Sequence, residues 1–150
     1  MKSLLLLSIL AAFVSGQGGP ECRCGAFVST HTGEEEVVQF PPINLDDCTQ
    51  DVQCAELCLA EWEEATNGGD LCNPTGDGDT IADDMCASLA EKGVDRLQPH
   101  TVYLYYNLCE GPWQWDGVQS QQELECKNDT AIIDCAGPSG TPMFSTTMLP

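Results

Sequence analysis

The chain has 150 residues, of which 24 are acidic and five are basic, so its formal net charge at pH 7 is −19. A field of this sign repels phosphate backbones and anionic membrane surfaces, which disfavours DNA binding, RNA binding and cationic antimicrobial action. Cations and basic partners remain, beside the plainer interpretation that the charge only keeps the surface solvated.

The first 16 residues, MKSLLLLSILAAFVSG, combine a basic Lys2 with an apolar run and end in small residues. This pattern is typical of a secretory signal peptide, and the apolar run is too short to span a hydrocarbon layer of about 30 Å. We therefore expect a secreted, extracellular protein without membrane insertion. Residues 1–16 are the expected signal peptide, residues 17–135 a single disulfide-stapled domain, and residues 136–150 a flexible tail.

All ten cysteines follow the expected signal peptide, and an even number of cysteines in an exported chain predicts five disulfides. Thiolate metal sites and CxxC redox chemistry belong mainly to reducing compartments, so we expect staples and no catalytic cysteine. Each disulfide stabilises a fold by about 2–4 kcal/mol, which compensates for the modest core of a chain of this size.

Two segments near the beginning of the expected domain are rich in β-branched and aromatic residues. They are RCGAFVST, residues 23–30, and VVQF, residues 37–40. We expect a hairpin with its turn near Thr32 and Gly33, in which the stretch HTGEEE interrupts the two strands. The prolines at 41 and 42 end the second strand, because neither can donate to a sheet ladder.

A change of period then predicts a helix from about Thr49 to Thr66. Asp46, Asp47 and Thr49 are all acceptable N-caps, and the glycines after Asn67 suit a left-handed helix end. On this helix Cys54 and Cys58 leave the same face, one turn apart.

The spacing of four cysteines suggests how strand and helix are joined. Cys22 and Cys24 leave one face of an extended strand about 6.6–7 Å apart, and Cys54 and Cys58 are separated by about 6 Å along the helix. Because these spacings match, we expect two parallel disulfides that join the first pair to the second. The remaining three disulfides, with partners left open, involve Cys48, Cys72, Cys86, Cys109, Cys126 and Cys135.

This arrangement resembles the cystine-stabilised helix motif of defensins and scorpion toxins, in which a CxxxC helix is joined to a CxC strand. The resemblance covers four residues, and here the CxC pair precedes the helix instead of following it. It implies a geometry and no function.

The segment DLCNPTGDGDT, residues 70–80, is a loop by composition. A second helix is expected from about Thr80 to Gly93. Its inward residues would be Ile81, Met85, Cys86 and Leu89.

Aspartates at the junction of this loop and helix suggest a cation site. Asp77 and Asp79 alternate with glycines, and Asp83 and Asp84 follow, so their carboxylates could converge on Ca²⁺. The stretch distantly resembles the calcium loops of thrombospondin type 3 repeats, although Thr80 stands where a turn glycine is needed and residue 86 is not a carboxylate. The alternative is a solvated acidic loop that caps the helix.

The run TVYLYY, residues 101–106, predicts a strand in the middle of a small sheet. Val102, Leu104 and Tyr106 would lie on one face, with Tyr103 and Tyr105 on the other. Residues 110–122 have the composition of a turn-rich connection, and residues 123–135 of a last short strand or a disulfide-bounded loop.

Aromatic residues from these two segments could form a shelf. Trp113 and Trp115, near Tyr103 and Tyr105, would offer a sugar or a protein partner a large contact area at low entropic cost. The alternative is that they pack in the core, as aromatic residues in small domains often do.

Enzymatic chemistry finds little support, because His31 and His100 are the only histidines and neither a nucleophile elbow nor a zinc-protease motif occurs. We therefore expect no catalytic residues and no cofactor other than, in one alternative, Ca²⁺. Asn128 begins an Asn-Asp-Thr sequon for N-glycosylation.

These patterns together predict a small disulfide-rich α+β domain, with an antiparallel sheet and two helices. The expected function is that of a secreted, acidic, non-enzymatic protein that binds a basic protein or carbohydrate partner, as an interaction or signalling module. Two alternatives stay open. They are a calcium- or mineral-associated matrix protein that uses residues 77–84, and a secreted enzyme of unrecognised type.

Overall fold

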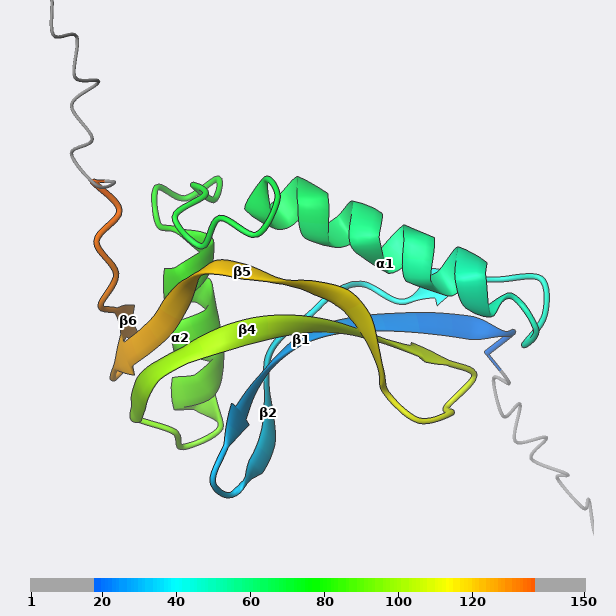
Figure 1. Cartoon of the computed structure of the whole chain (residues 1–150), viewed down its shortest axis with the longest axis horizontal. Coiled ribbons are helices and arrows are strands. Elements are labelled where there is room, and N and C mark those ends of the chain that lie inside the picture. The colour runs from blue at the N-terminus through cyan, green and yellow to red at the C-terminus, as the bar shows by residue number, and fades with distance from the viewer. Residues whose placement is uncertain (1–17, 137–150) are drawn as a thin grey trace, which may run out of the picture.

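The computed structural model describes residues 18–136 and shows a curled antiparallel sheet with two helices (Figure 1). The helices are α1 (Asp51–Thr66) and α2 (Ile81–Glu91). The strands are β1 (Glu21–Thr30), β2 (Gly33–Gln39), β3 (Ile43–Asn44), β4 (Arg96–Leu108), β5 (Gln114–Lys127) and β6 (Thr130–Ala131). The small, disulfide-rich α+β class predicted from the sequence is confirmed. The expected signal peptide, and the expected tail from residue 137 onward, lie outside the described residues.

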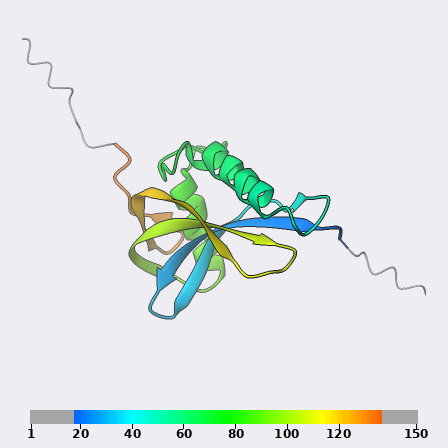
Figure 2. The ribbon, with the colours of Figure 1, turned by 45° about the vertical axis from the view of Figure 1, so that its right-hand side comes forward.

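The strands follow the order β2-β1-β4-β5-β6, and β3 pairs with the beginning of β1. Helix α1 packs against β1, β4 and β5, whereas α2 contacts both end strands of the order, β2 and β6. Because one helix reaches both ends, the sheet must curl around the helical side. Figure 2 shows α1 lying along this curled sheet. Neither helix of the described part is long and apolar enough to cross a membrane.

The alternation of side chains in the central strands sets the two faces of the sheet. Val102, Leu104 and Tyr106 are buried on the helical side, and Tyr103 and Tyr105 point to the other side and are half-buried. This is the division predicted for residues 101–106. The core between sheet and helices is completed by Ala26, Val28, Val37, Trp62, Leu71, Met85, Leu89 and Leu124.

Two expectations about strands are wrong. Residues 110–122 are not a turn-rich connection, because Gln114 onward belongs to the long strand β5. The pairing of β5 with β4 shifts register at three places. Such irregularities accommodate residues that a regular strand disfavours. One of these shifts, between Leu97 and His100, lets β4 run through Pro99. Likewise the glutamates from Glu34 to Glu36 do not interrupt the hairpin but form part of β2.

The start of α1 also differs from the prediction. The N-cap is Gln50, which makes no side-chain cap, while Asp47 accepts a hydrogen bond from the Thr49 amide in the turn before the helix. Asp51, in the first helical turn, instead accepts bonds from the Tyr106 hydroxyl and the Gln114 amide, both at 3.0 Å. These bonds attach the start of α1 to β4 and β5.

Helix α2 begins as predicted. Thr80 is its N-cap and forms a reciprocal capping box with Asp83. The expected inward residues Ile81, Met85, Cys86 and Leu89 are all buried.

Five disulfides cross-link the described residues, and none of their cysteines is free. Cys22 bonds Cys54 and Cys24 bonds Cys58, which is the pairing between the two sets that the spacing predicts. The other three join Cys48 to Cys109, Cys72 to Cys135 and Cys86 to Cys126.

Replacing both Cys24 and Cys58 by alanine should lower the free energy of unfolding by about 2–5 kcal/mol. Both residues are fully buried, so the variant loses packing as well as a constraint on the unfolded chain. The matched control replaces Cys72 and Cys135, which close a longer loop, with a sequence separation of 63 instead of 34. Denaturant unfolding should show the larger loss for the buried pair. A larger loss of stability for the control pair would mean that loop entropy contributes more to stability than the packing of the joint between β1 and α1.

Candidate binding face on the open side of the sheet

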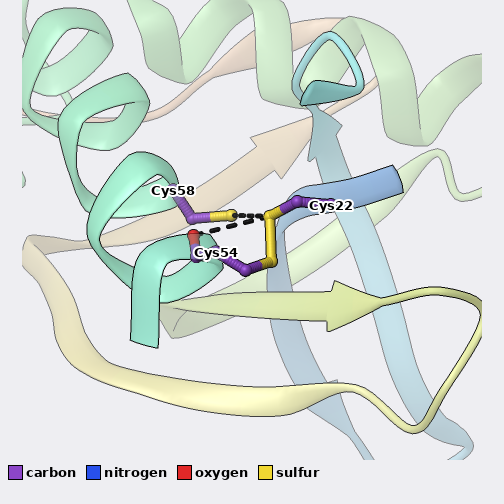
Figure 3. A group of neighbouring side chains, drawn as sticks. All are labelled: Cys22, Cys54 and Cys58. Atoms are coloured by element: carbon purple, nitrogen blue, oxygen red, sulfur yellow. Dashed lines mark hydrogen bonds between the residues drawn. A yellow bond between two sulfur atoms is a disulfide. The ribbon is translucent and has the colours of Figure 1, made fainter. Parts of the chain in front are cut away.

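The sulfur atoms of Cys22, Cys54 and Cys58 lie within 4.8 Å of one another and have the geometry of a metal-ligand group (Figure 3). Cys22 and Cys54 are bonded to each other, and Cys58 is bonded to Cys24. Because disulfide sulfurs are not thiolates, the 3.6 Å between the Cys22 and Cys58 sulfurs is a packing contact between two staples. The group therefore fixes β1 to α1 and does not provide metal ligands.

The four aspartates of the predicted calcium loop are not brought together. Among the described residues, no three of their oxygens meet within the distance that the cysteine sulfurs do. Asp83 accepts hydrogen bonds from the Thr80 hydroxyl and amide and from the Ala131 amide. Burial opposes its charged form, but these bonds outweigh burial and hold the pKa of Asp83 below its ordinary value.

Asp84 behaves in the opposite way. Its partial burial, followed by the charges of Asp79, Asp77 and Asp83, raises its pKa. Thr80 and Asp83 of this segment cap α2, and the calcium site stays a prediction.

The sheet face opposite the helices carries the predicted aromatic residues. Trp113 and Trp115 are 39% and 55% exposed, whereas Trp62 on the helical side is 1% exposed. Tyr103 and Tyr105 lie on this same open face, joined by Phe27 of β1, which is paired with Tyr103 across the strands. We call these five residues, Phe27, Tyr103, Tyr105, Trp113 and Trp115, the aromatic face.

The rings of the aromatic face pack edge to face. The Phe27 ring centre lies 5.4 Å from that of Tyr105 and 4.9 Å from that of Trp113, and Tyr103 and Trp115 are 6.3 Å apart with their planes at 79°. Gly25 allows this close approach, because a β-carbon there would lie 2.8 Å from the Phe27 ring and 3.3 Å from Trp113. The rings are thus held by one another and by the backbone beneath them.

Beside these rings the open face is hollowed into a shallow depression of about 440 Å³. Its lining includes Tyr103, Tyr105 and Trp115, together with Ser29, Thr101 and Glu123. We call it the aromatic depression. Glu34 of β2 does not line the depression but adjoins it through Ser29, whose hydroxyl donates a 2.6 Å hydrogen bond to the Glu34 carboxylate.

Strand register explains why the two glutamates flank the depression. Glu34 is opposite Ser29, and Glu123 is opposite Thr101. Ser29 and Thr101 both line the depression and directly follow or precede the last pair of β1 and β4, Val28 with Val102, so the two glutamates lie on the outer strands β2 and β5. Burial raises the pKa of the Tyr105 phenol, and the charge of Glu34 raises it further. The Glu34 carboxylate therefore affects one ring of the aromatic face.

The two histidines are arranged as follows. His31 is exposed in the turn between β1 and β2. His100 lines the depression with its Nδ1 atom 2.6 Å from the Gln98 carbonyl oxygen. Since a carbonyl can only accept, Nδ1 carries the hydrogen and donates.

The described residues contain all 24 acidic residues and four basic ones, so their formal charge is 4 − 24 = −20. Only two ion pairs form within this part of the chain, Arg23 with Glu21 and Lys92 with Glu36. Most carboxylates therefore have no basic partner among the described residues.

Sequence reasoning identified the two tryptophans and two tyrosines but missed Phe27, Glu34 and Glu123. A usable signal for Phe27 exists in the cysteines. Since Cys22 and Cys24 must face the helix, a period of two turns Phe27 away from it. The glutamates could not be assigned in the same way, because residues 110–122 were interpreted as a connection and not as the strand that leads to Glu123.

Comparison of the chain with family models, with curated proteins and with solved structures found no match.

One carboxylate on the helical side of the sheet is poorly accommodated. The Oδ2 atom of Asp116 is buried and has no hydrogen-bond partner among the described residues. Burial raises the pKa of Asp116 to about 6. Its charge also contributes to the raised pKa of Tyr106, after burial of that phenol and its bond with Asp51.

Replacing Asp116 by asparagine should stabilise the protein at pH 7 and have little effect at pH 4. The folded state holds the Asp116 proton more tightly than the unfolded chain, whose pKa is about 3.9. This group therefore favours folding most below about pH 4, and its contribution is lost as the pH rises through 6. The gain at pH 7 should be about 1 kcal/mol, since partial solvent exposure reduces the effect.

The control for this experiment is Asp95→Asn, which removes the same charge at an exposed position. Thermal unfolding of both variants across pH 4–8 separates local burial from the general repulsion of an acidic protein. If the free energy of unfolding changed with pH in the same way in both variants, the burial of Asp116 would not explain its effect.

Proposed function

We propose that this chain is an exported, acidic, non-enzymatic protein that binds a positively charged protein partner through the aromatic face and the glutamates beside it. The observation that carries the proposal is a cluster of aromatic rings that leaves Trp113 and Trp115 exposed beside the carboxylate of Glu123, on the sheet face opposite the helices. Five disulfides fit an extracellular type of protein, which supports the expectation of export.

The exposure of the two tryptophans favours a binding role over a core role for these rings. Leaving Trp115 more than half exposed forfeits part of the favourable burial that a large ring would gain in a core. Exposed aromatic residues on a rigid strand supply large contact area at low entropic cost, as residues central to protein interfaces do. The sheet beneath is held to α1 by two buried disulfides, so a partner would meet a preformed surface.

Charge favours a basic partner over a carbohydrate. A neutral sugar could stack on the rings and donate hydroxyl hydrogen bonds to Glu34 and Glu123, but it would leave the charge of both carboxylates unpaired. A basic segment would satisfy both features, and the chain's charge of −20 would speed its approach at low salt.

A selection from a random peptide library on the oxidised protein tests this function. Bound peptides should be enriched in arginine and lysine, and their binding should weaken as salt screens the charges. The Trp115→Ala variant should lose this enrichment, whereas Val52→Ala, an exposed apolar residue on α1, should keep it. Neutral or acidic peptides, or peptides that bind both variants equally, would contradict the proposal.

We also propose that Asn128 is glycosylated when the chain passes through a eukaryotic secretory pathway. Asn128 is exposed in the turn between β5 and β6, with a positive φ of 57°, and Thr130 completes the sequon. Secreted protein should lose mass on treatment with an N-glycosidase, and Thr130→Ala should abolish this change. An untreated mass equal to that of the bare polypeptide would rule the modification out.

A further inference from the structure

We propose that the aromatic depression is a subsite for a single arginine side chain of the basic partner. The inference rests on the proposed function and gives it a specific ligand group, the guanidinium. It is carried by the angle between two rings, the position of two carboxylates and the shallowness of the depression.

The rings form a corner that suits a planar cation. Tyr103 and Trp115 stand at 79° to each other with centres 6.3 Å apart, and Tyr105 also lines the depression. A cation that lies against the face of one ring meets the negative part of its quadrupole, and tryptophan is the strongest such partner. A guanidinium is flat, so it can stack on a ring face while its N–H groups stay free in its own plane.

The carboxylates supply acceptors for those N–H groups. Glu123 lines the depression directly. Glu34 accepts a 2.6 Å hydrogen bond from Ser29, which lines the depression too, and the charge of Glu34 acts on Tyr105. Among the described residues, neither carboxylate forms an ion pair with a basic residue of its own chain. Each is therefore free to accept from an incoming group, and a guanidinium offers five donors to reach them.

The shallow form of the depression selects guanidinium over ammonium. An open site of about 440 Å³ cannot surround an ammonium ion with enough acceptors to replace the water that it holds strongly. A guanidinium is more weakly hydrated and keeps its edge in solvent while its face covers the ring. Arginine should therefore bind better than lysine, although both carry the same charge.

Three capped tripeptides, Gly-Arg-Gly, Gly-Lys-Gly and Gly-citrulline-Gly, test this assignment on the intact oxidised protein. Citrulline has the shape of arginine without its charge. At low salt, NMR titration should follow the indole N–H signal of Trp115 and give a dissociation constant in the millimolar range for the arginine peptide. We expect binding about threefold weaker for lysine and about tenfold weaker for citrulline.

Two variants locate the binding. Glu123→Gln should weaken the arginine peptide about threefold, and Glu56→Gln, which removes the same charge from the exposed side of α1, should leave it unchanged. Trp115→Ala removes the ring and should weaken binding about fivefold, followed by the Tyr103 ring signals. Since Glu123 is exposed, its variant remains informative even where the tryptophan variant alters the fold.

Several results would overturn the assignment. Equal binding of the arginine and citrulline peptides would mean an aromatic surface without preference for charge, as a carbohydrate site would have. Equal binding of arginine and lysine, or equal losses in Glu123→Gln and Glu56→Gln, would mean diffuse attraction to an acidic protein.

The library selection and the tripeptide titration together distinguish a failure of this subsite from a failure of the proposed function. Suppose that basic library peptides need Trp115 for binding, but that each of their arginines can be replaced by citrulline without loss of affinity. This result would support the proposed function and contradict the arginine subsite. Failure of both the library selection and the tripeptide titration would remove both.

Discussion

The joint between β1 and α1 is the constraint on which the rest of the structure depends. Two adjacent buried disulfides, Cys22–Cys54 and Cys24–Cys58, fix which face of the sheet the helix covers. Because side chains alternate along a strand, the same joint turns Ala26 and Val28 toward the helices and turns Phe27 to the opposite side, where it is buried against Tyr105 and Trp113. The aromatic face is thus a consequence of cysteine spacing as much as of the aromatic residues themselves.

The negative charge of the molecule affects which partners this aromatic face would favour. An apolar aromatic face alone would bind many surfaces, and in the proposed function the carboxylates of Glu34 and Glu123 would favour groups that carry positive charge. The negative charge elsewhere on the surface would repel acidic proteins. The rings would then supply most of the binding energy, and the acids the selectivity and the rate of encounter.

The sequence predicted those parts of the fold in which local and long-range signals agree. The CxC and CxxxC spacings, the helix start near Thr80 and the alternation in residues 101–106 are signals of this kind, and the structure has these elements. Strand β5 was missed because Asp116 and Gly117 are residue types depleted in strands, and only pairing with β4 makes this segment a strand. The position of Glu123 depends on that pairing, so no local pattern could have placed it opposite Thr101.

Fluorescence quenching of the tryptophans by Cs⁺ and by I⁻ tests most directly that the open face is exposed, aromatic and negatively charged. In a Trp113→Phe variant the emission comes from buried Trp62 and exposed Trp115. The account predicts one fraction of the emission that Cs⁺ quenches more strongly than I⁻, a preference that shrinks when Glu34 and Glu123 are both replaced by glutamine. Emission that neither ion quenches, or that I⁻ quenches as strongly as Cs⁺, would contradict a cation-accepting aromatic face.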